Sequence, residues 1–125
     1  MNTVLIADDD PSMIHILSHI LKSEGYRVLQ ENNGLAALET ARRERPDLVI
    51  LDLMMPLLDG IGVLMKLYGD DPPFKSPAIL LTAQDSAEYR DLAESFGVVR
   101  FVEKPFDLDD LIRTIKESVA AKAES

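Results

Sequence analysis

The segment that decides the fold is Leu48-Val49-Ile50-Leu51-Asp52-Leu53-Met54-Met55-Pro56. Four consecutive apolar residues, two of them β-branched, precede one carboxylate and a turn that contains proline. This pattern is typical of a fully buried strand in a parallel sheet, because helices cover both faces of such a strand and no polar alternation is needed. Open α/β folds bind ligands at the carboxyl ends of their strands, so the pattern predicts that Asp52 lies at a ligand-binding edge.

Shorter runs of the same kind predict further strands at residues 4–7, 26–30, 78–82 and 100–103. Helices are expected from Pro11 to a C-cap at Gly25, from Asn33-Gly34 to Arg45-Pro46, and at residues 61–68, 86–96 (capped by Gly97) and 108–119. Strands that alternate with helices predict an α/β fold with a doubly wound parallel sheet of five strands. The flavodoxin-like (βα)5 order 2-1-3-4-5 suits the mixed polarity of residues 26–30, which fits an edge strand.

The apolar stripes of the helices predict their buried faces. In the second helix we expect an inner face of Leu35, Ala36, Leu38 and Ala41. In the first helix, the spacing of His15 and His19 is compatible with a metal site. They share a polar face with Ser18 and Lys22, however, and no glutamate lies between them to complete a metalloprotease motif, so a solvated face is the prediction.

Length and composition predict one domain over residues 1–125, with a core from about residue 2 to 120 and a frayed C-terminal tail. The net charge of −9 argues against nucleic-acid binding and against an anionic membrane surface. There is no cysteine, no apolar run of membrane-spanning length and no signal-peptide pattern at the N-terminus. A cytoplasmic protein is therefore expected.

Polar residues follow the predicted strands on their carboxyl side. Asp8 and Asp9 end the first strand and would lie beside Asp52, because strands one and three are neighbours in this order. Thr82 ends the fourth strand, and Lys104 follows the fifth. Carboxylates are the natural ligands of Mg²⁺, and an aspartate can itself be the nucleophile of an aspartyl-phosphate. A hydroxyl and an ammonium supply what a bound phosphoryl group needs.

The predicted carboxylate cluster is electrostatically costly. Two like charges about 4 Å apart repel by roughly 4 kcal/mol at an effective dielectric near 20. A divalent cation would resolve this repulsion, whereas core packing would not create it. Asp10 before Pro11 is instead predicted to be a helix N-cap, and Asp59 before Gly60 a turn residue.

Four motifs occur in one register along the chain. They are a strand ending in acids, the Asp52 strand with its turn, a strand ending in Thr-Ala, and a Lys-Pro-Phe connection, at residues 4–11, 52–60, 78–83 and 104–106. Their order and spacing resemble the receiver domain of bacterial two-component response regulators, of the chemotaxis-regulator kind. The resemblance covers about residues 2 to 120.

The resemblance implies that Asp52 accepts a phosphoryl group from the phosphohistidine of a sensor histidine kinase or of a histidine phosphotransfer protein. It also implies Mg²⁺ as the cofactor, held by Asp9, Asp52 and the backbone carbonyl of Met54, with Asp8 acting through a bound water. Water would later hydrolyse the acyl phosphate, so that the domain catalyses its own phosphorylation and dephosphorylation.

Further residues take roles from the same resemblance. Thr82 and Lys104 would contact the phosphoryl oxygens, and the Lys104–Pro105 peptide bond would be cis. Phe101 occupies the aromatic switch position. Phosphorylation would change the face made by the fourth helix, the fifth strand and the last helix, which a downstream effector domain or protein would read.

Two alternatives remain at this point. A receiver-like interaction domain that ignores phosphorylation typically loses one of the acids or the lysine, and this chain keeps them all. A flavin-binding protein or a dehalogenase-like phosphatase would need a polar phosphate-binding loop or a second acid two residues after Asp52, where Met54 stands. Val99 and Arg100 depart from the usual family pattern, and the sequence leaves their role open.

Overall fold

A sheet of five parallel strands forms the centre of the computed structural model, which describes residues 1–83, 87–96 and 99–124. The strand order is β2-β1-β3-β4-β5, which confirms the predicted flavodoxin-like topology. In chain order the strands are β1 (Thr3–Ala7), β2 (Arg27–Glu31), β3 (Leu48–Asp52), β4 (Ala78–Thr82) and β5 (Val99–Glu103). Every residue of β3 and β4 is buried, as their unbroken apolar sequence requires.

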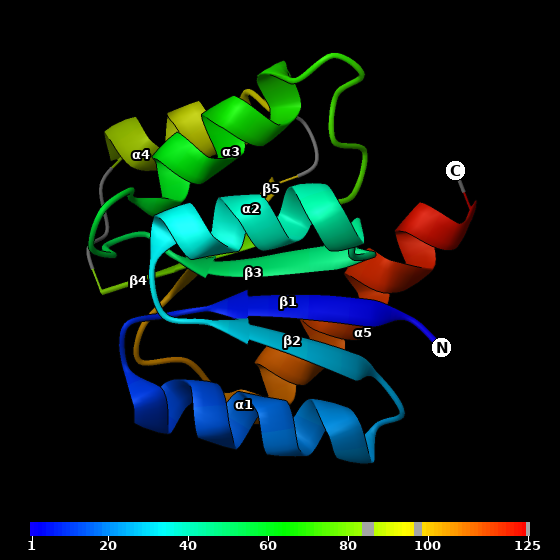
Figure 1. Ribbon diagram of the computed structural model, residues 1–125. Helices are drawn as coiled ribbons and strands as arrows, with labels where there is room; N and C mark the ends of the chain where they lie inside the picture. The colour runs from blue at the N-terminus through cyan, green and yellow to red at the C-terminus, as the bar shows by residue number, and fades with distance from the viewer. Residues whose placement is uncertain (84–86, 97–98, 125) are drawn as a thin grey trace.

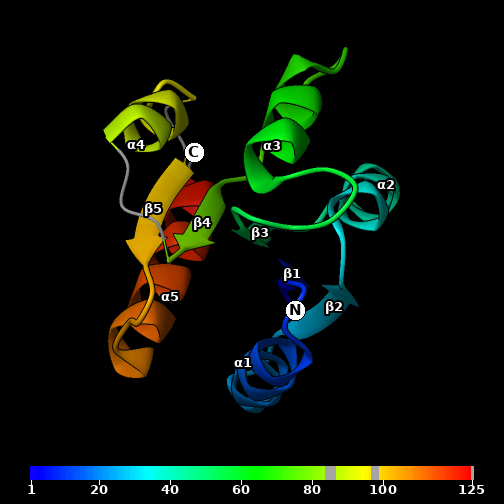
Figure 2. The same ribbon diagram turned by 90° about the vertical axis from the view of Figure 1, so that its left-hand side faces the viewer.

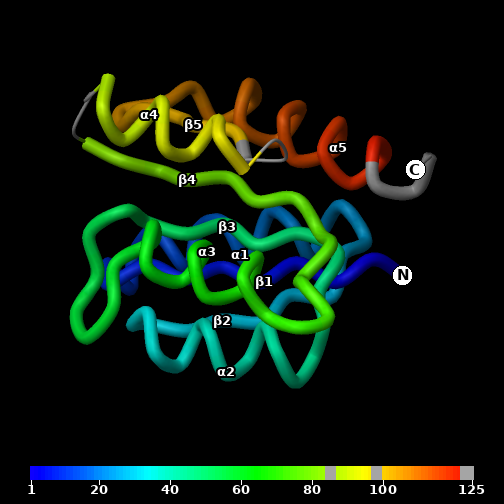
Figure 3. The backbone as a smooth tube through the Cα atoms, turned by 90° about the horizontal axis from the view of Figure 1, so that it is seen from above, coloured from blue at the N-terminus to red at the C-terminus, as the bar shows by residue number. Residues whose placement is uncertain are grey.

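Helices cover both faces of this sheet (Figure 1). They are α1 (Pro11–Ser23), α2 (Gly34–Glu44), α3 (Gly60–Gly69), α4 (Ala87–Glu94) and α5 (Leu108–Glu124). α1 and α5 lie on one face and share one hydrophobic core with it, while α2, α3 and α4 enclose a second core on the other face. Seen from above, α2 and α3 lie side by side and α4 lies over β5 (Figure 3). Within the described residues, no helix is long and apolar enough to cross a membrane.

Side chains that the sequence marks as caps begin three of the helices. Asp10 accepts a hydrogen bond from the backbone N–H of Ser12, Asn33 from that of Ala36, and Asp59 from that of Gly62. The interpretation of Asp10 and Asp59 as local structural residues is therefore confirmed. These caps fix where each helix begins, and with it the length of the loops at the carboxyl edge of the sheet.

The faces of two helices differ from the prediction. Leu35 is 44% exposed, and the buried stripe of α2 instead runs through Gly34, Ala37, Leu38 and Ala41. In α1 the predicted polar face was wrong at Ser18, which is buried in the stripe Ile14, Leu17, Ser18 and Leu21. Both stripes follow the spacing i, i+3, i+4 and i+7. The apolar Leu35 lies outside the stripe of α2, and the polar Ser18 lies inside the stripe of α1.

Smaller differences concern the ends of elements. β2 lies one residue later than expected, and α5 continues to Glu124, past the residue 120 at which we expected the core to end. The expected start of α4 at Ser86 and its cap at Gly97 lie outside the described residues.

Candidate functional site

The strand order brings three acids together at the carboxyl edge of the sheet, the edge that faces the viewer in Figure 2. Asp8 follows the last residue of β1, and Asp52 is the last residue of the neighbouring strand β3. Carboxylate oxygens of Asp8, Asp9 and Asp52 all lie within 4.8 Å of one another. Asp8 is only 1% exposed and Asp52 only 8%, whereas Asp9 is exposed to solvent. The sheet therefore assembles a cluster with two buried carboxylates and one accessible one.

Lys104, directly after β5, reaches this cluster from the other side. Its Nζ lies 3.1 Å from Oδ2 of Asp8 and 3.7 Å from Oδ1 of Asp52. The lysine side chain is 21% exposed, so its ammonium is largely shielded from water. The Lys104–Pro105 peptide bond is cis. Two of the three carboxylates contact this ammonium, and the site carries an excess of negative charge.

That excess shows in the titration of Asp52. The pKa of its carboxyl is raised from 3.8 to about 6, first by burial and then by the charge of Asp8, while Lys104 and a backbone hydrogen bond from Met54 act in the opposite direction. A group of oxygen ligands with more negative than positive charge is the kind of site that Mg²⁺ occupies in proteins. The donor set of the cluster therefore fits a hard divalent cation.

Thr82 and Phe101 lie on the strands beside the cluster. Thr82 is fully buried at the end of β4, and its carbonyl oxygen accepts a hydrogen bond from the backbone N–H of Lys104 at 2.7 Å. Phe101 is half-buried on β5, opposite Leu80 of β4 and away from the acids. The guanidinium carbon of Arg90 lies 4.7 Å from the centre of its ring, a cation–π contact that was not expected from the sequence.

The loop after β3, residues 53–59, forms one wall of the site. The side chain of Met54 is exposed on it, close in sequence to Asp52. Leu57 has a positive φ of 72°, and the N–H of Leu58 donates a hydrogen bond to the carbonyl of Pro56 at 2.8 Å. This is a γ-turn with a positive φ at its centre, a rare and strained conformation. Sequence reasoning placed a turn here but did not anticipate its strained form.

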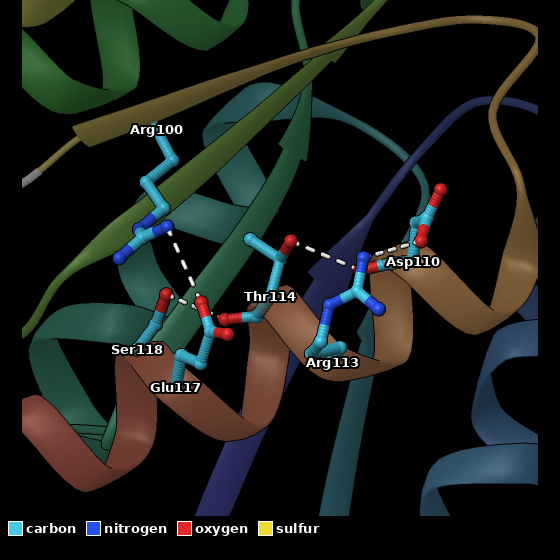
Figure 4. A network of polar contacts seen from close by, with 6 residues as sticks. All are labelled: Arg100, Asp110, Arg113, Thr114, Glu117 and Ser118. Atoms are coloured by element: carbon cyan, nitrogen blue, oxygen red, sulfur yellow. Dashed lines mark hydrogen bonds and ion pairs between the residues drawn. The ribbon is translucent and has the colours of Figure 1, made fainter.

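Polar contacts also tie β5 to α5 (Figure 4). Arg100 pairs with Glu117 at 3.6 Å, and on the same helix the hydroxyls of Thr114 and Ser118 donate to backbone carbonyls one turn earlier. Arg100 therefore has an ion-pair partner within the fold. The side chain of Val99 is not among those described.

Comparison with protein families gives one match over most of the chain. The model of the response regulator receiver domain matches residues 4–116. This range includes β2 to β5, β1 from Val4 on, and the clustered residues Asp8, Asp9, Asp52 and Lys104.

Curated relatives fall into two groups by length. The chain is 32% identical over 120 residues to sporulation initiation phosphotransferase F of Bacillus subtilis, covering 96% of this chain and 95% of that protein. It is 37% identical over 114 residues to the probable transcriptional regulatory protein TcrX of Mycobacterium tuberculosis, covering 91% of this chain but only 48% of the relative. The chain thus spans about half the length of several of the curated relatives it matches.

Solved structures agree with this. A CheY-like receiver domain protein of Methanospirillum hungatei superposes with a TM-score of 0.91 at 26% identity, over 99% of this chain and 98% of that one. The BeF3-activated receiver domain of Klebsiella pneumoniae RstA superposes with a TM-score of 0.84 at 29% identity, over 94% and 98%. Together with the family match, these relatives establish that the chain belongs to the response regulator receiver domain family.

Proposed function

We propose that this receiver domain acts through Asp52 as its phosphoacceptor. Receiver domains are the phosphorylatable signalling switches of two-component systems, and the family assignment extends that general role to this chain. The observation that carries the specific proposal is the position of Asp52. Its carboxylate ends a buried strand, lies within 4.8 Å of two other acids, and has the Lys104 ammonium 3.7 Å away.

Mg²⁺ is the cofactor that we propose for this site. Asp8, Asp9, Asp52 and the backbone carbonyl of Met54 would hold it, because these groups offer oxygen ligands around an excess of negative charge. When bound, the ion would neutralise charge on the transferring phosphoryl group. The other protein groups in the proposed reaction are side chains of this chain.

The proposed reaction is an in-line phosphoryl transfer. A carboxylate oxygen of Asp52 attacks the phosphorus of a phosphohistidine, the phosphorus–nitrogen bond breaks, and the imidazole leaves with the electron pair. The ammonium of Lys104 offsets charge on the phosphoryl oxygens, and the hydroxyl of Thr82 donates a hydrogen bond to one of them. Attack by water on the acyl phosphate later restores the carboxylate and releases inorganic phosphate.

Phosphorylation then shifts the population of two arrangements of the domain. The phosphoryl group adds about −1.5 to −2 charges and new acceptor oxygens beside Thr82. Movement of Thr82 toward it would change the packing of Phe101, which lies on the neighbouring strand β5. The face formed by α4, β5 and α5 would change with it, and we propose this face as the surface that a downstream effector domain or protein reads.

The proposed upstream partner is a histidine kinase or a histidine phosphotransfer protein, since the reaction needs a phosphohistidine donor. The net charge of −9 gives no support for direct contact with nucleic acid or an anionic membrane.

The test is direct phosphorylation. The purified chain is incubated with Mg²⁺ and acetyl phosphate, and its intact mass is followed with and without EDTA, with Asp52→Asn as the control. We expect the wild type to gain one phosphoryl group only with Mg²⁺, and the variant to gain none. A wild type that never gains this mass would refute the proposal in favour of an interaction domain that ignores phosphorylation.

A further inference from the structure

The first residue of α2, Gly34, touches the loop that follows the phosphoacceptor strand. A Cβ atom added to Gly34 would lie 1.7 Å from the carbonyl oxygen of Leu58 and 2.6 Å from its carbonyl carbon. The N–H of Gly34 also donates a long hydrogen bond of 3.3 Å to the carbonyl of Pro56. The two backbones are therefore packed so closely that no side chain fits between them.

The same loop is fastened at its other end by Gly60, the first residue of α3. Its N–H donates to the carbonyl of Leu53 at 2.8 Å, and an added Cβ would lie 2.7 Å from the carbonyl oxygen of Asp52. Met54, whose carbonyl we propose as a metal ligand, lies between the two fastened ends. Its position is thus set by both contacts together.

The strained turn at Leu57 indicates that the contact with α2 stabilises the conformation of this loop. A non-glycine residue in this conformation costs of order 1–3 kcal/mol and persists only where its surroundings hold it. Leu57 is exposed to solvent, so its own side chain contributes little to holding the turn. The flanking residues Pro56 and Leu58 both contact Gly34. The start of α2 therefore helps to hold the turn in place, together with the packing of Leu58 against the hydrophobic core.

We propose that Gly34 is a positioning residue for the phosphoacceptor site. Its missing side chain lets the start of α2 receive the loop of residues 53–59 and hold it where the Met54 carbonyl and the Asp52 carboxylate can bind one metal ion. The inference rests on the proposed function, because it assumes that Mg²⁺ binds at this site. Gly34 acts through the loop and touches neither the metal nor the phosphoryl group.

Three Gly→Ala variants form a graded test. Gly69→Ala is the matched control, since a Cβ there meets nothing within 4 Å. At Gly62 an added Cβ meets the Cδ1 atom of Leu58 at 2.6 Å and its Cγ atom at 3.2 Å, so the side chain of Leu58 must shift and the loop is disturbed less than by a clash with its backbone. At Gly34 the added Cβ meets backbone, so the loop itself must shift.

The readouts are the Mg²⁺ dissociation constant, from melting temperatures over a MgCl₂ titration, and the rate of phosphorylation by acetyl phosphate. Replacing a residue that orients metal ligands without touching the metal typically weakens metal affinity by about 10-fold or more. We expect about that weakening in Gly34→Ala, a smaller one in Gly62→Ala and none in Gly69→Ala. Phosphorylation should slow in the same order.

The outcomes separate this inference from the proposed function. A wild type whose melting temperature ignores Mg²⁺ would refute the metal site itself. If the wild type binds Mg²⁺ and Gly34→Ala binds it equally well, even with a lower melting temperature, Gly34 is merely structural and the inference is wrong.

Should Gly34→Ala fail to fold, Gly62→Ala decides the matter with Leu58→Ala as a second-site change. The double variant removes the atom that the new Cβ would strike. Weakened Mg²⁺ binding in Gly62→Ala that Leu58→Ala reverses would support the inference, and binding equal to that of Gly69→Ala would overturn it.

Discussion

At the scale of single residues, Asp52 is more difficult to ionise in the folded chain than in the unfolded one. Burial and then the charge of Asp8 raise its pKa from 3.8 to about 6. Below about pH 4 the carboxyl is protonated in both states and the raised pKa has no effect on stability. Between about pH 4 and 6 the unfolded carboxyl is ionised while the folded one still holds its proton, so stability falls as the pH rises, and the loss is complete once the folded carboxyl has ionised above its pKa of about 6.

Asp52→Asn should therefore stabilise the metal-free protein at pH 7.5 and hardly at pH 4. A shift of about two units corresponds to about 3 kcal/mol, and partial screening by water reduces the expected gain in unfolding free energy to about 1–2 kcal/mol. Urea unfolding at both pH values measures it. Equal stability of the two proteins at pH 7.5 would show that the folded surroundings do not disfavour the charged Asp52 carboxylate. Added Mg²⁺ should stabilise the wild type more than the variant.

Lys104 contributes the ammonium that contacts both buried acids, and Lys104→Met removes that charge while keeping much of the apolar stem. Asp8 is almost fully buried, so the loss of its partner should cost about 2–3 kcal/mol of metal-free stability. Mg²⁺ can replace the lost charge, so its stabilising effect should be larger in the variant, whereas phosphorylation by acetyl phosphate should be slower. Thermal unfolding with and without Mg²⁺ checks the first two points. Lys75→Met, at an exposed lysine, is the control and should change neither.

At the scale of elements, the hydroxyl of Ser18 occupies a place in α1 that suits an apolar group. It is buried, and no hydrogen-bond partner for it occurs in the described part of the chain. Ser18→Ala should raise the unfolding free energy by about 1 kcal/mol or more, because an unsatisfied buried hydroxyl is removed and alanine favours helix. Ser23→Ala on the same helix is the comparison, because it removes an exposed hydroxyl that already donates a hydrogen bond to the carbonyl of Ile20. Chemical denaturation should rank Ser18→Ala as the more stable variant; the opposite order would contradict the prediction.

An element could be predicted well where its own residues determine its position, and less well where contacts with distant parts of the chain do. β3 and β4 were predicted to the residue, since an apolar run buried on both faces needs no partner to be recognised. The face of α2 was wrong at Leu35, because its rotation is set by contact with α3 rather than by polarity alone. The positions of the acids followed from strand ends and strand order. The contact of Gly34 with Leu58 could not be foreseen, since it joins the start of α2 to the backbone of a loop that is distant in sequence.

At the scale of the whole molecule, the proposed switch links the acidic edge to the α4-β5-α5 face. We expect beryllofluoride with Mg²⁺ to shift the fluorine resonance of Phe101 in protein labelled with 4-fluorophenylalanine, assigned by Phe101→Leu. Thr82→Ala should abolish or strongly reduce this shift, because Thr82 is the proposed connection between the acyl phosphate and β5. A full shift in Thr82→Ala would mean that the signal travels by another route.

The ion pair between Asp8 and Lys104 joins residues 96 positions apart. During synthesis on a ribosome, the acids of β1 and β3 therefore emerge long before the ammonium that the finished site places between them. A chain that has not yet folded β5 onto β4 lacks this cation beside Asp52, and it lacks the strand that carries Phe101. In the proposed mechanism, a chain without its last strand would therefore lack both the cation that offsets phosphoryl charge and the aromatic ring that reports it.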